Sequence, residues 1–370
     1  MKVISLVRRL ISIAILVGIL IAFAFLKNNR DIAEFFTTNI TSRFVGVMSN
    51  ASRVIKFSFT EVLFLLIIIF TIIKLIMFIV ALCKIKIIKA LCRLCGIATS
   101  ILSIMVIYSF SCEMAYARKD MPLPYYTSTV DRSQFADIYN YFADDINYCV
   151  DSLSFDDSGE INNGFGLDYL SDAVTKSYQI VVDPYFYPTN GSIKPMISSF
   201  IYRELQITGV TFSPLGEANI NIYTPMTQLP ITVAHELAHT KGVMREDDAN
   251  KLAFYVCLNS YDTLLRYSSY VFHFDQIEAM ASKLDESERA SLHTINPIFY
   301  KSRNYQKEYW QKHDALGQIG DFFNNMYIKS SGVEEGVESY HGGTSYEYDP
   351  GTFTFTPSDY QMLFFDRYFF

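Results

Sequence analysis

Charged residues are scarce in this sequence. Only 19% of its 370 residues are charged, and 31 basic residues against 38 acidic ones leave a formal net charge of −7. The polar part has no basic stripe interleaved with aromatic residues, so nothing indicates a nucleic-acid partner. The chain also has no internal repeat, which excludes a repeat architecture.

The sequence also has few cysteines that form a recognisable pair. The six cysteines are Cys83, Cys92, Cys95, Cys112, Cys149 and Cys257. Cys92 and Cys95 form a lone CxxC, whereas a zinc or redox site normally has a second pair or a thioredoxin-like context. Four of the six lie in or beside apolar segments, where cysteine behaves as a small hydrophobic residue. Cys149 and Cys257 could form a disulfide, and the sequence leaves this open.

Hydrophobic residues, by contrast, make up half of the chain, and the mean hydropathy is +0.17. A soluble domain of this size rarely has such a composition, so membrane spans are expected. Three apolar runs lie in the first third of the chain, at about residues 10–26, 59–82 and 96–112. Each comes close to or exceeds the length that a membrane-spanning helix needs. Lys74 interrupts the second run, and such a lysine usually snorkels or faces another helix.

Basic residues flank these runs unevenly. Three precede the first run and four separate the second from the third: Lys2, Arg8, Arg9, Lys84, Lys86, Lys89 and Arg93. The positive-inside rule places both groups in the cytoplasm. With three spans, residues after about 116 then lie outside. The sequence therefore predicts a multi-pass protein of the cell membrane, with a transmembrane region at 1–115 and an extracytoplasmic domain at 116–370.

The second of these regions is expected to be mostly helical with a small sheet, so the predicted fold class is mainly α (α+β). Apolar residues at helical spacing predict a helix from Phe135 to Ile146. Further patterns predict a loop at 151–166, strands at 178–182 and 217–223, a helix at 194–207, helices through 230–330 and an irregular stretch at 331–357. The tail, 358–370, is rich in aromatic residues.

The most informative stretch contains His-Glu-x-x-His, at His235, Glu236 and His239. Histidines four residues apart lie above one another on a helix face, so two imidazoles can bind one metal ion. The glutamate after the first histidine can act as a general base. Pro230 suits the first turn of this helix, and Gly242 suits the left-handed position after its end.

A catalytic zinc site normally has three protein ligands and one open position. Arg245 occupies the position where an HExxHxxGxxH pattern would have its third ligand, and arginine cannot bind zinc. Glu246 opens a second, acid-led helix, and a break at Gly242 would let that helix fold back and direct Glu246 at the two histidines. Asn250, one turn later, could then hydrogen-bond a ligand imidazole.

Each of these features has an ordinary explanation as well. Two histidines on a helix can be a hydrogen-bonded surface pair, acidic residues suit any first helical turn because of the helix dipole, and Gly242 can be a plain C-cap. The combination of a capped short helix, HExxH and a second acid-led helix with E-x-x-x-N favours the metal site.

This arrangement resembles the gluzincin metallopeptidases, especially the membrane-bound group that includes the CAAX prenyl protease and the heat-shock membrane protease. The resemblance implies zinc bound by His235, His239 and Glu246, with Glu236 as the catalytic base. Asn250 stands where the group has an aspartate that supports a histidine. The chain resembles more closely still a bacterial family with three N-terminal spans and an outer domain with T-V-A-H-E-x-A-H-x-x-G-x-x-R-E-D-x-A-N. That match includes residues 216–221, Gly-Glu-Ala-Asn-Ile-Asn.

The predicted function is therefore a membrane-anchored zinc-dependent peptidase with a zincin-like outer domain and a peptide or protein substrate. The strand at 217–223 could pair with an extended substrate if it is a sheet edge, or it could be an ordinary core strand. Tyr223, Tyr270 and His273 are candidate oxyanion donors, although packing roles suit them better. His293, His313 and His341 lie in polar surroundings and are expected on the surface.

Two alternatives stay open. One is a non-catalytic membrane scaffold or sensor that keeps zinc for structure, which would need a fourth protein ligand. The other is a zinc hydrolase of another envelope component.

Overall fold

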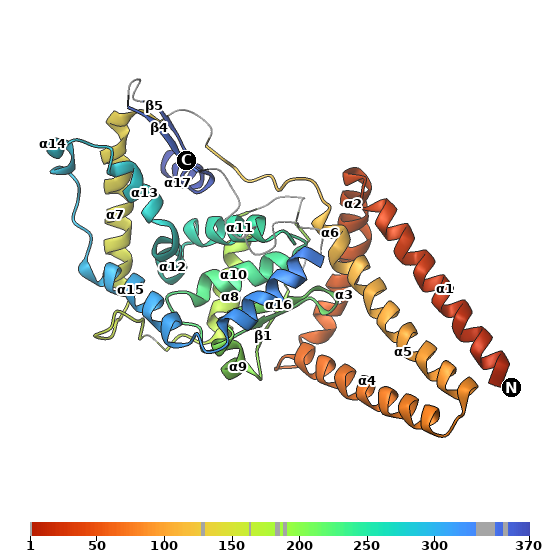
Figure 1. Ribbon diagram of the computed structural model, residues 1–370. Coiled ribbons are helices and arrows are strands. Elements are labelled where there is room, and N and C mark those ends of the chain that lie inside the picture. The colour runs from red at the N-terminus through yellow and green to blue at the C-terminus, as the bar shows by residue number, and fades with distance from the viewer. Residues whose placement is uncertain are drawn as a thin grey trace.

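The computed structural model describes residues 2–126, 130–162, 164–181, 186–187, 191–330, 345–350 and 354–370. It is mostly helical and contains one three-stranded and one two-stranded sheet (Figure 1). A group of long helices at the N-terminal end stands apart from a globular part formed by the rest of the chain (Figure 1). The expectation of a mainly α fold with small sheets is therefore confirmed.

Three helices in the described part of the chain are long and apolar enough to cross a membrane. They are α1 (Lys2–Leu26), α4 (Phe59–Cys83) and α5 (Ile87–Tyr108). Helix α5 packs against both α1 and α4. Lys74 faces α5, because its Nζ donates to the Gly96 carbonyl at 3.2 Å and to the Ser100 hydroxyl at 2.6 Å. Three helices that could span a membrane are therefore present as predicted, and of the two positions expected for Lys74 the structure has the one facing another helix.

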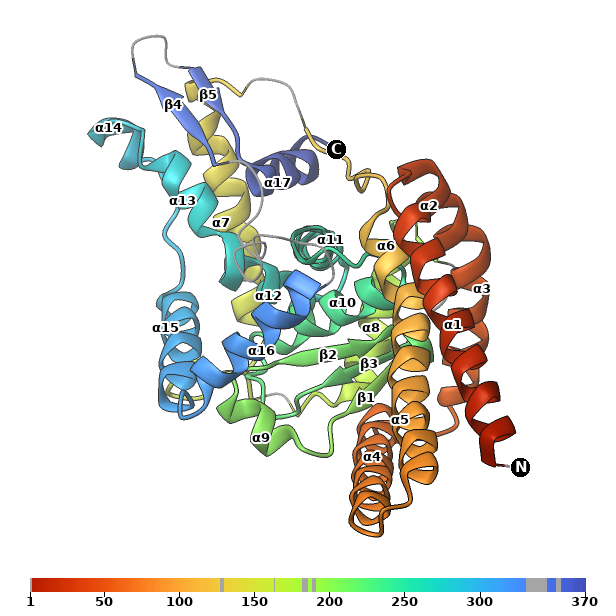
Figure 2. The same ribbon diagram turned by 45° about the vertical axis from the view of Figure 1, so that its right-hand side comes forward.

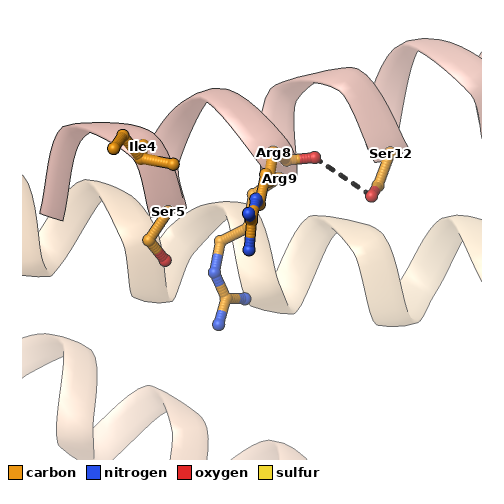
Figure 3. A pocket seen from close by; sticks show the side chains of 5 residues that line it. All are labelled: Ile4, Ser5, Arg8, Arg9 and Ser12. Atoms are coloured by element: carbon orange, nitrogen blue, oxygen red, sulfur yellow. Dashed lines mark hydrogen bonds between the residues drawn. The ribbon is translucent and has the colours of Figure 1, made fainter. Parts of the chain in front are cut away.

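The N-terminal end of α1 carries an arginine-lined cavity of about 500 Å³ (Figure 3). Its lining residues are Ile4, Ser5, Arg8, Arg9 and Ser12. Arg9 also lies against α5, since a Cβ atom added at Gly96 would lie only 2.6 Å from its Nη1. The glycine thus lets the arginine approach the neighbouring helix closely.

Between α1 and α4 the chain forms α2 (Arg30–Phe36), a π-helical turn η1 (Thr37–Thr41) and α3 (Ser42–Ser52). This segment packs against the globular part. Arg30 pairs with Asp120 at 2.6 Å, and Lys27 pairs with Glu113. The segment between the first two spans and the chain after residue 116 therefore lie at the same end of the membrane helices, while the turn at 84–86 lies at the other end.

Helix α5 continues through a π-helical turn, η2 (Ser109–Glu113), into α6 (Met114–Tyr116), which leads to the globular part. There, a sheet of three short strands contains β1 (Ser192–Pro195), β2 (Gly209–Phe212) and β3 (Glu217–Ile220) in the order β1-β3-β2. Strand β3 is fully buried, parallel to β1 and antiparallel to β2, with Gly209 opposite Ile220. The predicted strand at 217–223 is confirmed for 217–220. The idea that it forms a sheet edge is wrong, because it is the central strand and β2 lies at the edge.

Of two other predictions for this region, one is wrong and one is confirmed in part. Residues 178–181 form no strand, because Tyr178 ends α8 (Leu167–Tyr178) and the next residues turn. A short apolar run cannot be distinguished by pattern alone from a buried helix end. The helix predicted at 194–207 is confirmed for α9 (Ser199–Glu204), whereas residues 194–195 end β1. Pairing with β3 overrides the local helical pattern there.

The helical core contains α7 (Phe135–Ser152), α10 (Leu229–Thr240), α11 (Glu246–Leu258), α12 (Thr263–His273), α13 (Asp275–Ala281), α14 (Glu286–Arg289), α15 (Pro297–Lys312) and α16 (Gly317–Ser330). The helices predicted at 135–146 and through 230–330 are confirmed. Cys149 and Cys257 are both buried as free thiols, so they form no disulfide.

The C-terminal region is more regular than its composition predicts. Strands β4 (Glu347–Asp349) and β5 (Thr354–Thr356) pair antiparallel within the stretch expected to be irregular, of which 331–344 and 351–353 lie outside the described residues. The aromatic tail forms α17 (Asp359–Phe369), which packs against α11. Its buried residues Leu363, Phe364 and Phe365 complete the core behind α11.

The contact between α3 and the sheet can be tested at Gly216. Its φ of +60° disfavours any side chain, and a Cβ atom there would lie 2.7 Å from the Ser49 Cβ. We expect Gly216→Ala to destabilise the protein by about 2 kcal/mol through backbone strain and overpacking, measured as a lower thermal midpoint of the detergent-solubilised chain.

Gly164→Ala is the matched control, because Gly164 has a similar φ of +64° and no atom within 4 Å of the added Cβ. Equal shifts in the two variants would show that α3 does not pack tightly on the sheet.

Candidate metal centre

Two helices and the turn between them build the site. Pro230 lies in the first turn of α10, and Val233, Ala234 and their neighbours pack it into the core. The chain then turns at Gly242, whose φ is +86°. A Cβ atom at this glycine would lie 2.5 Å from the Tyr187 ring. Only glycine combines this backbone conformation with such a close contact, and the turn directs the start of α11 back towards α10.

The turn brings His235, His239 and Glu246 together. The Nε2 atoms of the two histidines are 3.0 Å apart. The Glu246 Oε2 atom lies 3.2 Å from Nε2 of His235 and 3.5 Å from Nε2 of His239. One possible ligand atom from each of the three side chains lies within 4.8 Å of the others. The predicted fold-back of the second helix therefore occurs, and Glu246 occupies the expected position.

Backbone contacts and charge prepare these groups for a cation. The Nδ1 atom of His239 lies 2.8 Å from the Val243 carbonyl, so Nδ1 donates to that carbonyl and Nε2 is the nitrogen that would lose its proton to bind a metal ion. Burial lowers the pKa of His239, but the Glu246 carboxylate outweighs it and raises the pKa to about 9. Burial likewise opposes ionisation of Glu246, but the two histidines hold its pKa well below its usual range.

The donor set fits a zinc ion. The Oε2 atom of Glu246 is buried, with the two histidine Nε2 atoms beside it, and a buried carboxylate is costly unless a positive charge compensates it. Two imidazole nitrogens and one carboxylate oxygen are ligands that zinc accepts in catalytic sites. The described residues place no fourth histidine, cysteine or acidic side chain in this group. Such a three-ligand set leaves a coordination position open.

Glu236 is held next to this group by the edge strand β2. The Thr211 hydroxyl lies 2.7 Å from its Oε2 atom and 2.8 Å from its carbonyl oxygen. A Cβ atom at Gly209 would lie 2.5 Å from the Glu236 Oε1 atom, so the glycine makes room for the carboxylate. Burial raises the pKa of Glu236. No pattern in the sequence indicates Gly209 and Thr211, because both lie in a short strand with no local signature.

Charged side chains also hold the turn at Gly242 in place. Arg118, 1% exposed, makes a two-pronged ion pair with Glu34 of α2, through contacts of 2.6 and 3.0 Å. Its Nη1 atom donates to the Gly242 carbonyl at 3.1 Å. Arg245, next to Glu246, pairs with Asp248 and with Asp120. The turn is therefore connected to the segment between the first two membrane helices.

The remaining candidates lie elsewhere or have other partners. Asn250 is half-buried one turn after Glu246. The Nδ1 atom of His239 already contacts the Val243 carbonyl. A hydrogen bond from Asn250 to a ligand imidazole therefore stays a prediction, and it concerns His235. Tyr270 donates to Asp145 at 2.5 Å, and His273 stacks on Tyr360. Tyr223 is half-exposed.

The other three histidines were expected on the surface. His293 pairs with the exposed Asp144 at 2.8 Å, and His313 pairs with Glu204 at 3.0 Å in a partly exposed position. His341 lies outside the described residues.

The model of one protein family, described as "Protein of unknown function (DUF3810)", matches residues 36–346. The match covers most of the chain, which therefore belongs to this family. No curated protein and no solved structure matches the chain.

Metal uptake tests the centre directly. We expect the full-length protein, purified in detergent and supplied with zinc, to hold about one ion per chain, because three ligands converge. His239→Ala should reduce this more than ~10-fold, since it removes one of only three donors. The zinc content of the protein is measured by inductively coupled plasma mass spectrometry after gel filtration.

His293→Ala, which removes a surface histidine paired with Asp144, is the matched control and should keep the full metal content. Wild-type protein that stays folded and takes up no zinc would contradict the metal site.

Proposed function

We propose that this member of the DUF3810 family is a membrane-anchored zinc-dependent peptidase. The observation that carries the proposal is the convergence of His235, His239 and Glu246 around one point, with the buried Glu236 carboxylate beside them. The three side chains would hold the ion. When bound, zinc supplies Lewis-acid chemistry that polarises a carbonyl and acidifies a water molecule.

Glu236 would transfer the protons. A general base works best when its pKa approaches the working pH, and burial shifts the pKa of Glu236 in that direction. The carboxylate would accept a proton from the attacking water and deliver it to the leaving amine. Thr211 and Gly209 fix its position, and such positioning is a large part of catalysis.

Strand β2 supports a peptide substrate in particular. It is paired with β3 on one side and is half-exposed along all four residues. In the described part of the chain no other strand pairs with it. An extended peptide could add to this edge and thereby pass Glu236, which contacts both Gly209 and Thr211 of the same strand.

The proposal includes a zincin-like fold for the globular part and an extracytoplasmic location. The order of an edge strand, an HExxH helix and a glutamate-bearing helix supports the fold and agrees with the resemblance to gluzincins. The uneven basic residues support the location, because those at the turn between α4 and α5 have no acidic neighbours in sequence, whereas Lys27 and Arg30 pair with acidic residues.

Replacement of Glu236 by Gln separates a peptidase from a zinc-binding scaffold. The amide keeps the shape of the side chain but cannot accept the proton, so we expect peptide cleavage to fall at least ~100-fold while zinc content and thermal midpoint stay unchanged. Cleavage is measured with a proteome-derived peptide library and mass spectrometry. If the protein is a scaffold, the wild type and Glu236→Gln will give the same result in this assay, and no cleavage will depend on Glu236.

Gly209→Ala tests how the edge strand positions this base. The added Cβ would lie 2.5 Å from the Glu236 carboxylate and displace it, although no metal ligand is altered. We expect a loss of cleavage of roughly 10- to 100-fold with zinc retained, since a misplacement near 1 Å costs about this much. Gly166→Ala, with open space around the added Cβ, is the control. Full activity in Gly209→Ala would contradict the proposed position of the base.

A further inference from the structure

The sheet that carries the site rests directly on a membrane helix. The ring of Phe212, at the end of β2, contacts the ring of Phe64 in α4, with centroids 5.2 Å apart. Thr60, in the first turn of α4, donates from both its backbone nitrogen and its hydroxyl to the buried Glu217 of β3, at 2.9 and 2.7 Å. The outer end of α4 and the sheet are therefore in close contact (Figure 2).

This contact limits the distance from the site to the lipid. A span of ~20 residues crosses the ~30 Å hydrocarbon core, so counting from Leu82 places the outer hydrocarbon edge near residue 63. Phe64, and Phe212 against it, thus lie at that edge. Gly209 lies three residues from Phe212, which is ~10 Å along a strand. Because Gly209 lies against Glu236, the carboxylate lies at most roughly 15 Å from this edge, whatever the direction of the strand.

Exposed apolar side chains surround the same end of α4. Val54 and Phe57 precede the helix, and Ile197, Phe200 and Ile201 belong to the segment that includes α9. Their exposed fractions run from 43% for Ile201 to 83% for Val54. Glu61, in the first turn of α4, accepts hydrogen bonds from the backbone nitrogens of Ile197 and Ser198.

These five residues form an interfacial patch fixed at the height of the membrane surface. Their apolar surface is large for a region facing water but suits the boundary between headgroups and acyl chains. The lipid surface is its occupant, because the patch is continuous with a helix that spans the membrane.

We propose that the site acts on polypeptides that are themselves anchored in the membrane, at a bond within about five residues of the lipid. A distance of at most roughly 15 Å corresponds to about four or five extended residues, and the interfacial patch keeps the sheet from moving away. The step is hydrolysis: one water adds across the C–N bond, its oxygen goes to the acyl carbon and a proton to the amine. This assignment rests on the proposed peptidase function and names its substrate class.

The test uses the full-length protein reconstituted in phosphatidylethanolamine–phosphatidylglycerol vesicles with one anchored substrate. That substrate carries a single membrane span followed by two copies of a sequence cleaved in the peptide library, about four and about 25 residues from the span. Both copies have the same anchor and the same surface concentration, so the ratio of cleavage at the two copies depends only on their distance from the span. We expect the near copy to be cut at least ~10-fold more often, because the far copy rarely approaches the site.

Equal cutting of the two copies, or preference for the far copy, would overturn the substrate assignment and leave the peptidase intact. No Glu236-dependent cleavage of any free or anchored peptide would overturn the peptidase itself. The double variant Phe200→Ser/Ile201→Ser should reduce the preference for the near copy without changing cleavage of free peptides. Tyr261→Ser, at a 92% exposed aromatic residue outside the patch, should leave the preference unchanged.

Discussion

The turn at Gly242 determines whether the three candidate metal ligands meet. Without a left-handed residue at this position, α10 would continue or leave in another direction, and Glu246 would not meet the two histidines. The Tyr187 ring occupies the space where a side chain would lie, and the Val243 carbonyl that follows the turn orients His239. One backbone conformation therefore sets both the position of Glu246 and the orientation of the His239 ring.

Arg118 links this turn to the membrane region. It is almost fully buried, and it binds the Gly242 carbonyl and the Glu34 carboxylate together. A buried ion pair of this kind contributes little net stability when intact, but the loss of one partner costs about 3–5 kcal/mol. The segment between the first two membrane helices is therefore part of the frame of the site.

The same frame joins the site to the first turns of α4. Thr60 and Phe64 of α4 contact two strands of the sheet, and the edge strand contacts Glu236. A flexible linker would let the globular part move away from α4, whereas Thr60 and Glu217 are both buried where the helix meets the sheet. The proposed substrate class depends on these contacts between α4 and the sheet.

The sequence by itself determined the three membrane helices and the HExxH helix, because long apolar runs and the i, i+4 spacing are local properties that no distant contact overrides. It also indicated Glu246 through the break at Gly242. The roles of Gly209 and Thr211, the central place of β3 and the strand at 192–195 were decided only by tertiary structure. Short strands take their identity from their partners, and a glycine reveals its purpose only when the side chain that fills its space is known.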